Sequence, residues 1–143
     1  MASAHVSHST ELPATPQDAW KRFADFSVYS AWNVNHVDFP DGPPTLASGA
    51  EFREQLQVRR APAEVKWVVS TFAPDREIVL DGKGPMGIKL RQTFTFEPAG
   101  EGSRFANTLE FSAVALKPMI SALEKEVGKT VAESVQRFRA QLG

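Results

Sequence analysis

The sequence predicts one α+β domain in which a curved antiparallel β-sheet wraps around a long C-terminal helix. Three observations predict this fold class. Between residues 50 and 111, apolar residues alternate with polar ones in several short segments, which is the period of half-buried strands. Turns rich in Pro and Gly separate these segments, so neighbouring strands pair antiparallel, because parallel neighbours need a crossover of a dozen or more residues. From Leu116 to Leu142 the period changes to three and four residues, typical of an amphipathic helix of about 25 residues.

The chain opens with a short Ser/Thr-rich segment, residues 4–11, which we expect to be an edge strand closed by Pro13. A helix should follow it. Thr15 can cap this helix, Pro16 suits its first position, and Asp18 favours the positive end of its dipole. The apolar face of the helix carries Ala19, Trp20, Phe23 and Phe26, and a second short helical turn is expected over residues 27–32.

Five further strands are expected after a loop over residues 39–49, which hold three prolines and two glycines. The long helix at the end needs an equally long concave surface to bury its apolar stripe, and the sheet is the only candidate. We place the strands at residues 50–58, 64–72, 77–82, 88–96 and 105–111, and the turns between them at residues 61–62, 73–75, 84–87 and 98–102.

Composition places the chain, residues 1–143, among ordinary single-domain globular proteins, with 42% hydrophobic and 23% charged residues. The formal net charge is −1, and Lys and Arg are scattered. Because of this charge distribution we expect no nucleic-acid partner. We also expect no membrane insertion, since no segment reaches 18 apolar residues. No secretory signal is expected, cysteine is absent, and we expect a cytoplasmic protein that is a monomer or a weak homodimer.

Several short motifs occur in an order that points to a known superfamily. They are Leu12-Pro13-Ala14-Thr15-Pro16 entering Asp18-Ala19-Trp20, then Phe23-Ala24-Asp25-Phe26, Trp32-Asn33, Gly49-Ala50-Glu51-Phe52, Glu101-Gly102-Ser103-Arg104-Phe105 and the C-terminal helix. In these motifs the chain resembles the START-like, or SRPBCC, superfamily, which includes the birch-pollen-allergen proteins and bacterial polyketide cyclase/dehydrase-like proteins. The resemblance spans nearly the whole chain.

The resemblance implies a helix-grip fold, with two short helices after the first strand and a cavity between the concave sheet and the long helix. It implies an entrance near the loops and the short helices. It does not identify a ligand, because one fold hosts many functions. Some bacterial relatives are toxin components of toxin–antitoxin pairs, and that role stays open as a minor possibility.

Strand parity predicts which side chains face the inside of the sheet. Nearly all are apolar, and the exceptions are Glu54, Gln92 and Asn107. A buried polar group without a partner costs a few kcal/mol, so each must meet protein, water or a ligand. Either these three are the polar contacts of a pocket, or they satisfy one another, or a bulge shifts the parity.

The candidate ligand-binding set combines these three residues with the aromatic and apolar side chains expected around the cavity. For each aromatic ring the alternative is ordinary core packing, and Tyr29 and Trp32 are expected beside the pocket mouth. The set is Phe23, Phe26, Tyr29, Trp32, Phe52, Glu54, Trp67, Val69, Leu90, Gln92, Phe94, Asn107, Leu109, Met119, Leu123 and Val127.

Motifs for metals and cofactors are missing from the sequence. His5 and His8 have opposite parity on one strand, and His36 has no ligand-type spacing to another histidine or a carboxylate, so we expect no metal site. There is no nucleophile elbow, Walker loop or dinucleotide fingerprint, and residues 82–87 are a hairpin turn. We expect no cofactor.

The leading functional hypothesis is binding of a small hydrophobic molecule, lipid or polyketide-like, without catalysis or with weak catalysis. The alternative is a cyclase or dehydratase in which Glu54 acts as a general acid or base with Gln92, Asn107 or Tyr29. A third hypothesis is an interaction protein of the toxin or stress type, whose mark would be a contiguous exposed apolar patch.

Overall fold

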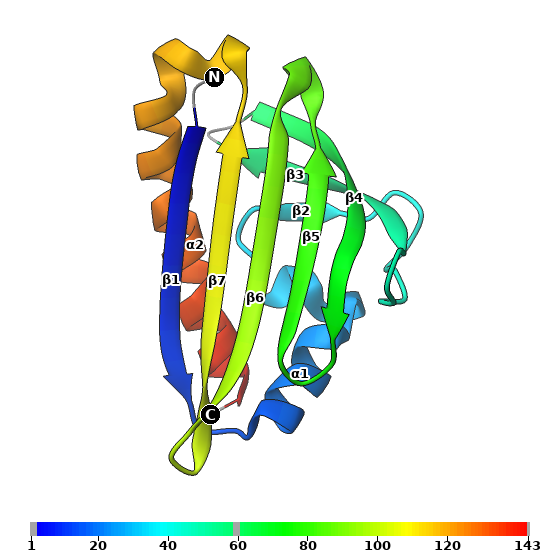
Figure 1. Cartoon of the computed structure of the whole chain (residues 1–143), viewed down its shortest axis with the longest axis vertical. Helices are drawn as coiled ribbons and strands as arrows, with labels where there is room; N and C mark the ends of the chain where they lie inside the picture. Colours follow the sequence, from blue (N-terminus) through cyan, green and yellow to red (C-terminus); the bar gives the residue numbers. More distant parts are fainter. Residues whose placement is uncertain (1–2, 59–60, 143) are drawn as a thin grey trace.

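Seven antiparallel strands form one curved sheet in the computed structural model, which describes residues 3–58 and 61–142. The order across the sheet is β1-β7-β6-β5-β4-β3-β2, and the sheet curls around α2 (Figure 1). The expected α+β helix-grip architecture is confirmed. The strands are β1 (Ser3–Leu12), β2 (His36–Asp38), β3 (Glu51–Val58), β4 (Ala61–Ala73), β5 (Glu77–Lys83), β6 (Lys89–Ala99) and β7 (Gly102–Ser112).

Two short helices follow β1, as predicted: α1 (Pro16–Ala24) and the 3-10 helix η1 (Phe26–Ala31). The side chain of Thr15 caps α1 by accepting a hydrogen bond from the backbone N–H of Asp18 at 3.2 Å. The short turn η2 (Pro85–Gly87) joins β5 to β6. The inner face of the sheet is covered by α1, η1 and the C-terminal helix.

The long helix α2 (Ile120–Leu142) is 23 residues long and begins later than the apolar period predicts. The first predicted turn is instead a 3-10 helix, η3 (Val114–Met119), with Pro118 inside it. A proline disfavours the α conformation of the residue before it, so the regular helix begins only after Pro118.

Two features of the sheet differ from the sequence prediction. The three-residue strand β2 was not expected, because so short a segment has no readable period; it pairs with β3, His36 opposite Leu56. The predicted turn at Ala61-Pro62 lies inside β4, where Pro62 pairs with Gln57. Pairing of β4 with β5 starts only at Lys66, so Pro62 has a neighbouring strand on one side, where proline is tolerated.

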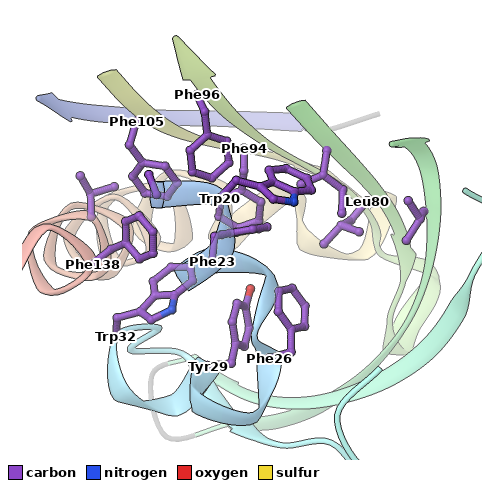
Figure 2. Packing of buried hydrophobic residues seen from close by; sticks show 14 of the residues in the cluster. Trp20, Phe23, Phe26, Tyr29, Trp32, Leu80, Phe94, Phe96, Phe105 and Phe138 are labelled. Atoms are coloured by element: carbon purple, nitrogen blue, oxygen red, sulfur yellow. The ribbon is translucent and has the colours of Figure 1, made fainter. Parts of the chain in front are cut away.

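An aromatic core fills the end of the sheet next to α1. The ring of Phe23 lies 4.7 Å from that of Phe94, and the ring of Phe138 on α2 lies 4.5 Å from that of Phe105, centroid to centroid. Trp32 packs edge-on against Phe138 at 5.0 Å. Figure 2 shows these rings between α1, α2 and the strands. This end of the molecule is therefore solid.

A smaller apolar cluster fixes the first half of α2. Val127 and Val131 pack against Val6 on β1 and Leu109 and Phe111 on β7. The helix thus lies along one side of the sheet, behind β1 and β7 in Figure 1.

We predict that Phe23→Ala lowers the free energy of unfolding by about 3–5 kcal/mol, because it removes a fully buried ring from the centre of the aromatic core. Denaturant unfolding followed by circular dichroism measures the change. The control is Met119→Ala, a half-exposed side chain, for which a loss below about 1 kcal/mol is expected. Equal losses in the two variants would contradict the packing described.

Candidate ligand-binding cavity

A cavity of about 270 Å³ lies between the inner face of the sheet and α2. Most of its wall is apolar, with a few polar groups, the usual composition of a small-molecule site. Its lining residues are Asn33, Asn35, Glu54, Leu56, Ala63, Val65, Trp67, Pro85, Met86, Ile88, Leu90, Gln92, Asn107, Leu109, Phe111, Met119, Leu123, Val127, Val131 and Ser134.

Part of the predicted ligand-binding set lines this cavity. Strand parity correctly placed the strand residues of this part on the inner face, and the C-terminal helical segment supplies the opposite wall. The members that line the cavity are Glu54, Trp67, Leu90, Gln92, Asn107, Leu109, Met119, Leu123 and Val127. Their contact with a ligand stays a prediction.

The remaining members of the predicted set lie elsewhere, and for them a place in the cavity wall is corrected to core packing. Parity reports which face of the sheet a side chain is on, but not which end of that face lies under a cavity. Phe23 on α1 and the rings of Phe26 and Tyr29 on η1 fill one end of the face. Trp32, Val69 and Phe94 are buried in the same core, and Phe52 is partly buried against it.

The mouth of the cavity lies between η2 and η3. Of the lining residues, Pro85, Met86 and Met119 are the exposed ones, Met86 with 72% and Met119 with 48% of its surface accessible. The entrance is therefore not beside Tyr29 and Trp32, which are both buried. Met86 has a backbone φ of +60°, an uncommon conformation for a residue other than Gly, Asn or Asp.

Glu54 is a buried carboxylate in the wall of the cavity. Its Oε1 accepts a hydrogen bond from Nε1–H of Trp67 at 2.9 Å, and its Oε2 lies 2.7 Å from Nδ1 of His36. An ionised carboxylate only accepts, so this nitrogen of His36 carries the proton. The side chains of Glu54 and His36 are each only 5% exposed. Both oxygens of the carboxylate are thus held in place.

His36 is a site residue that the sequence analysis did not select. Its ring lies 4.3 Å from that of Phe39 and 5.0 Å from that of Tyr29, which fixes its orientation. His36 also lines a separate surface groove together with Gln57, Glu126 and Thr130. It therefore stands in the wall between this groove and the ligand cavity. No sequence signal marks it, because its partner Glu54 is reached only through the pairing of β2 with β3.

Gln92 and Asn107 form a second polar position in the cavity wall. Nε2 of Gln92 donates a hydrogen bond to Oδ1 of Asn107 at 3.1 Å. This bond uses the amide nitrogen of Gln92 and the carbonyl oxygen of Asn107, so the carbonyl oxygen of Gln92 and the amide nitrogen of Asn107 lie outside it. Of the expected alternative, that the inward polar residues satisfy one another, the structure shows this one bond.

Further polar residues of the wall come from outside the strands. Ser134 on α2 accepts a hydrogen bond from the backbone N–H of Val34 at 2.9 Å, and Asn33 accepts one from the backbone N–H of Asn35 at 3.1 Å. Ser134 follows Val127 and Val131 by seven and three residues, so helical spacing could have placed it on the inner face. The two asparagines follow η1 and carry no such signal.

Tyr29 lies behind the carboxylate, in the core. Burial raises the pKa of the Tyr29 phenol well above its ordinary value of 10.0, and the negative charge of Glu54 raises it further. A hydrogen bond with Asn33 acts in the opposite direction and is the smallest of the three effects. Tyr29 is therefore neutral at physiological pH and cannot accept a proton from a ligand.

Gly82 makes room for the Trp67 ring. The two residues are opposite each other on β5 and β4, and a Cβ atom at Gly82 would lie 2.6 Å from the Trp67 ring and 2.8 Å from Val65. Contacts that short do not occur, so a side chain at this position forces the ring to move. The absence of a side chain at Gly82 is thus part of what places Nε1–H of Trp67 on Glu54.

The described residues contain neither a group of metal ligands nor a helix that could span a membrane. Within residues 3–58 and 61–142, no three His, Asp or Glu side chains are grouped so that they could hold a metal ion. No helix in the same part of the chain is long and apolar enough to cross a membrane.

Comparison with known families bears on this architecture. Residues 3–143 match the family described as polyketide cyclase/dehydrase and lipid transport. The chain belongs to this family.

Two Mycobacterium tuberculosis proteins (strain H37Rv) are similar to this member of the family over nearly their whole length. The protein named Uncharacterized protein Rv1546 is 29% identical over 142 residues, which cover 98% of this chain and 99% of that protein. The protein named Toxin Rv0910 is 25% identical over 137 residues, which cover 94% of this chain and 95% of that protein.

Solved structures share the fold. The Zhui aromatase/cyclase from Streptomyces sp. R1128 superposes with a TM-score of 0.77 at 13% identity, covering 99% of this chain and 94% of that one. A START superfamily protein from Mycobacterium smegmatis superposes with a TM-score of 0.75 at 18% identity, covering 96% of each chain. At these identities the likeness shows the fold alone, and it agrees with the superfamily resemblance noted in the sequence.

We predict that Gly82→Ala lowers the free energy of unfolding by about 1–3 kcal/mol, because its methyl group overpacks the Trp67 ring. The indole N–H signal of Trp67 in NMR spectra, identified with Trp67→Phe, should move toward the position of a free indole. The matched control is Gly128→Ala on α2, where a Cβ meets only Val6 at 3.9 Å. That change should stabilise the protein by about 0.5–1 kcal/mol. If Gly82→Ala changed neither the free energy of unfolding nor the indole N–H signal, the described contact between Gly82 and Trp67 would be wrong.

We also predict an abnormal titration of Tyr29, the single tyrosine of the chain. Ultraviolet absorbance of the phenolate in the folded protein should appear only well above pH 10, since the pKa is raised. The unfolded chain releases this proton near pH 10 while the folded chain retains it, so stability falls as pH rises through this range. In Glu54→Gln the pKa should decrease, yet stay above the ordinary value, because burial is the larger cause. A phenolate signal of the folded protein centred near pH 10 would contradict the burial of Tyr29.

Proposed function

We propose that this protein binds a small, mostly apolar molecule in the cavity under α2, with one or two polar groups of the ligand on the cavity wall. The observation that carries the proposal is the cavity itself: a mostly apolar chamber with an open mouth and a few polar groups on its wall. One of these positions is the Gln92–Asn107 pair, whose mutual bond leaves one carbonyl oxygen and one amide nitrogen outside it. Such amide groups can accept a hydrogen bond from a ligand and donate one to it.

The volume and lining narrow the class of ligand. About 270 Å³ lies at the lower end of the range for ligand pockets, which is about 300–1,000 Å³. A molecule of up to three small rings, or a short lipid-like chain, fits this space better than a long polycyclic compound. Glu54 accepts hydrogen bonds and carries a negative charge, so it favours a hydroxyl group and disfavours a carboxylate in its neighbourhood.

Surface apolar residues argue for a ligand site rather than for an interaction protein of the toxin type. Among the described residues, the exposed large apolar side chains are Val37, Met86 and Met119. The two methionines belong to the mouth of the cavity, and Val37 is on β2. This is not the contiguous apolar patch that a protein partner would need. For location and assembly we propose the cytoplasm and a monomer or weak homodimer.

We predict that a neutral apolar fluorophore, N-phenyl-1-naphthylamine, binds with enhanced fluorescence, and that Leu123→Trp weakens its binding at least about tenfold by filling the cavity. Val37→Trp is the matched control, since it adds the same side chain at an exposed position outside the cavity. Native mass spectrometry and lipid extraction of protein from its own host then identify the natural ligand. Equal fluorophore affinity in Leu123→Trp and the unaltered protein would overturn the proposed function.

A further inference from the structure

The Glu54 carboxylate has unused capacity on the side of the cavity. A carboxylate offers about four lone-pair positions, and the bonds from Trp67 and His36 occupy one on each oxygen. Glu54 is also part of the cavity lining. A ligand in the cavity can therefore reach an oxygen of Glu54 without displacing either of its protein partners.

The surroundings of this carboxylate meet the geometric conditions for proton transfer. Val65, Leu56 and Trp67 line the wall around it, so few water molecules compete with a ligand for its lone pairs. A general base has to lie within hydrogen-bond reach of the proton that it removes and must keep a fixed geometry. The two donors fix the position of Glu54, and burial keeps the site apolar.

His36 acts on the carboxylate and not on the ligand. It is not among the cavity-lining residues, and its Nδ1 contacts Oε2 of Glu54. The rings of Phe39 and Tyr29 hold the imidazole in this orientation. His36 is therefore a positioning residue, and its other face borders the surface groove.

We propose that Glu54, positioned by His36 and Trp67, is a general base for ligands with an acidic C–H bond, such as a carbon next to a ring carbonyl. In this step an oxygen of Glu54 forms a bond to the proton, the C–H bond breaks, and its electron pair moves into the ligand as an enolate. Return of the proton to the same or another carbon completes an exchange or an isomerisation. No oxidant, reductant or further reactant is needed.

The Gln92–Asn107 pair lies at a separate position in the same cavity. Glu54 is on β3 and Asn107 is on β7, with three strands between them in the sheet. The amide pair is therefore suited to a second polar group of the ligand, away from the carbon that loses its proton. The inference rests on the proposed function, because a ligand must first enter the cavity.

A carbon acid with a coloured product tests the base directly. The probe is 5-nitrobenzisoxazole, a small aromatic molecule: removal of its ring C–H proton forms a nitrile, breaks the N–O bond and releases 2-cyano-4-nitrophenolate, which is yellow. We predict that the protein accelerates this reaction at least about 100-fold over the same concentration of acetate. In Glu54→Gln the excess rate should be lost, while Glu54→Asp, which keeps the carboxylate one methylene further away, should retain part of it.

Displacement of the fluorophore separates binding from chemistry. If N-phenyl-1-naphthylamine does not bind, the proposed function fails. If the fluorophore binds and 5-nitrobenzisoxazole does not displace it, or displaces it without turnover that depends on Glu54, the inference of a base is overturned while the binding function stands. Circular dichroism and fluorophore binding show whether each variant is folded. Equal rates for Glu54→Gln and the unaltered protein overturn the base in the same way.

Two variants of one residue test the positioning role of His36. His36→Asn keeps an N–H group near the place of Nδ1 and should retain most of kcat. His36→Phe keeps the aromatic packing with Phe39 but removes the donor, and should lower kcat about tenfold with little change in KM. If the role of His36 were purely structural, its substitution would change the stability of the protein but would not lower kcat at a nearly constant KM. If His36→Phe retains the full kcat, or if His36→Asn falls as far as His36→Phe, positioning through the Nδ1 hydrogen bond is wrong.

Discussion

The inner face of the curved sheet has to be covered by one long helix and a handful of aromatic rings, and this constraint decides where the molecule is solid and where it is hollow. The helix α2 packs along β1 and β7 and leaves the rest of the face open. Rings such as Phe23 and Trp32 fill the end next to α1. At the other end η2 and η3 are in contact, and Met86 and Met119 are exposed on them. The cavity is the part of the face that these elements do not fill.

A buried charge in such a wall is tolerated only if the surrounding structure satisfies it, and several elements of this fold meet that requirement together. Removing a carboxylate from water is costly unless hydrogen bonds replace the lost solvation. For Glu54 on β3, β4 contributes Trp67 and the edge strand β2 contributes His36. Gly82 on β5 leaves the space in which the Trp67 ring lies. One polar position thus links four neighbouring strands, and a change at any of the partners is transmitted to the cavity wall.

Local periodicity explains which parts of this arrangement are readable from the sequence. Alternation along a strand is a property of consecutive residues, so it placed Glu54, Gln92 and Asn107 on the inner face, and the helix stripe placed Leu123 and Val127 opposite them. It could not separate the cavity from the aromatic core, because that depends on how far the rings of α1 reach along the sheet. Nor could it select His36, whose role depends on a three-residue strand and a partner 18 residues away. Pro118 shows the same limit on a smaller scale, since the apolar period continues through it although the regular helix does not.

The distribution of polarity along the cavity also sets the direction in which the proposed ligand would lie. The mouth is formed by Pro85 and two flexible methionine side chains, which offer adaptable apolar contact but no strong hydrogen bond. The hydrogen-bonding groups of Glu54 and Asn107 are buried further along the wall. A ligand with a polar group at one end therefore loses less free energy when this group leads into the cavity, because only there does protein replace the water that is stripped away. The apolar remainder then fills the mouth, so the polar group of the proposed ligand would lie beside Glu54 or Asn107.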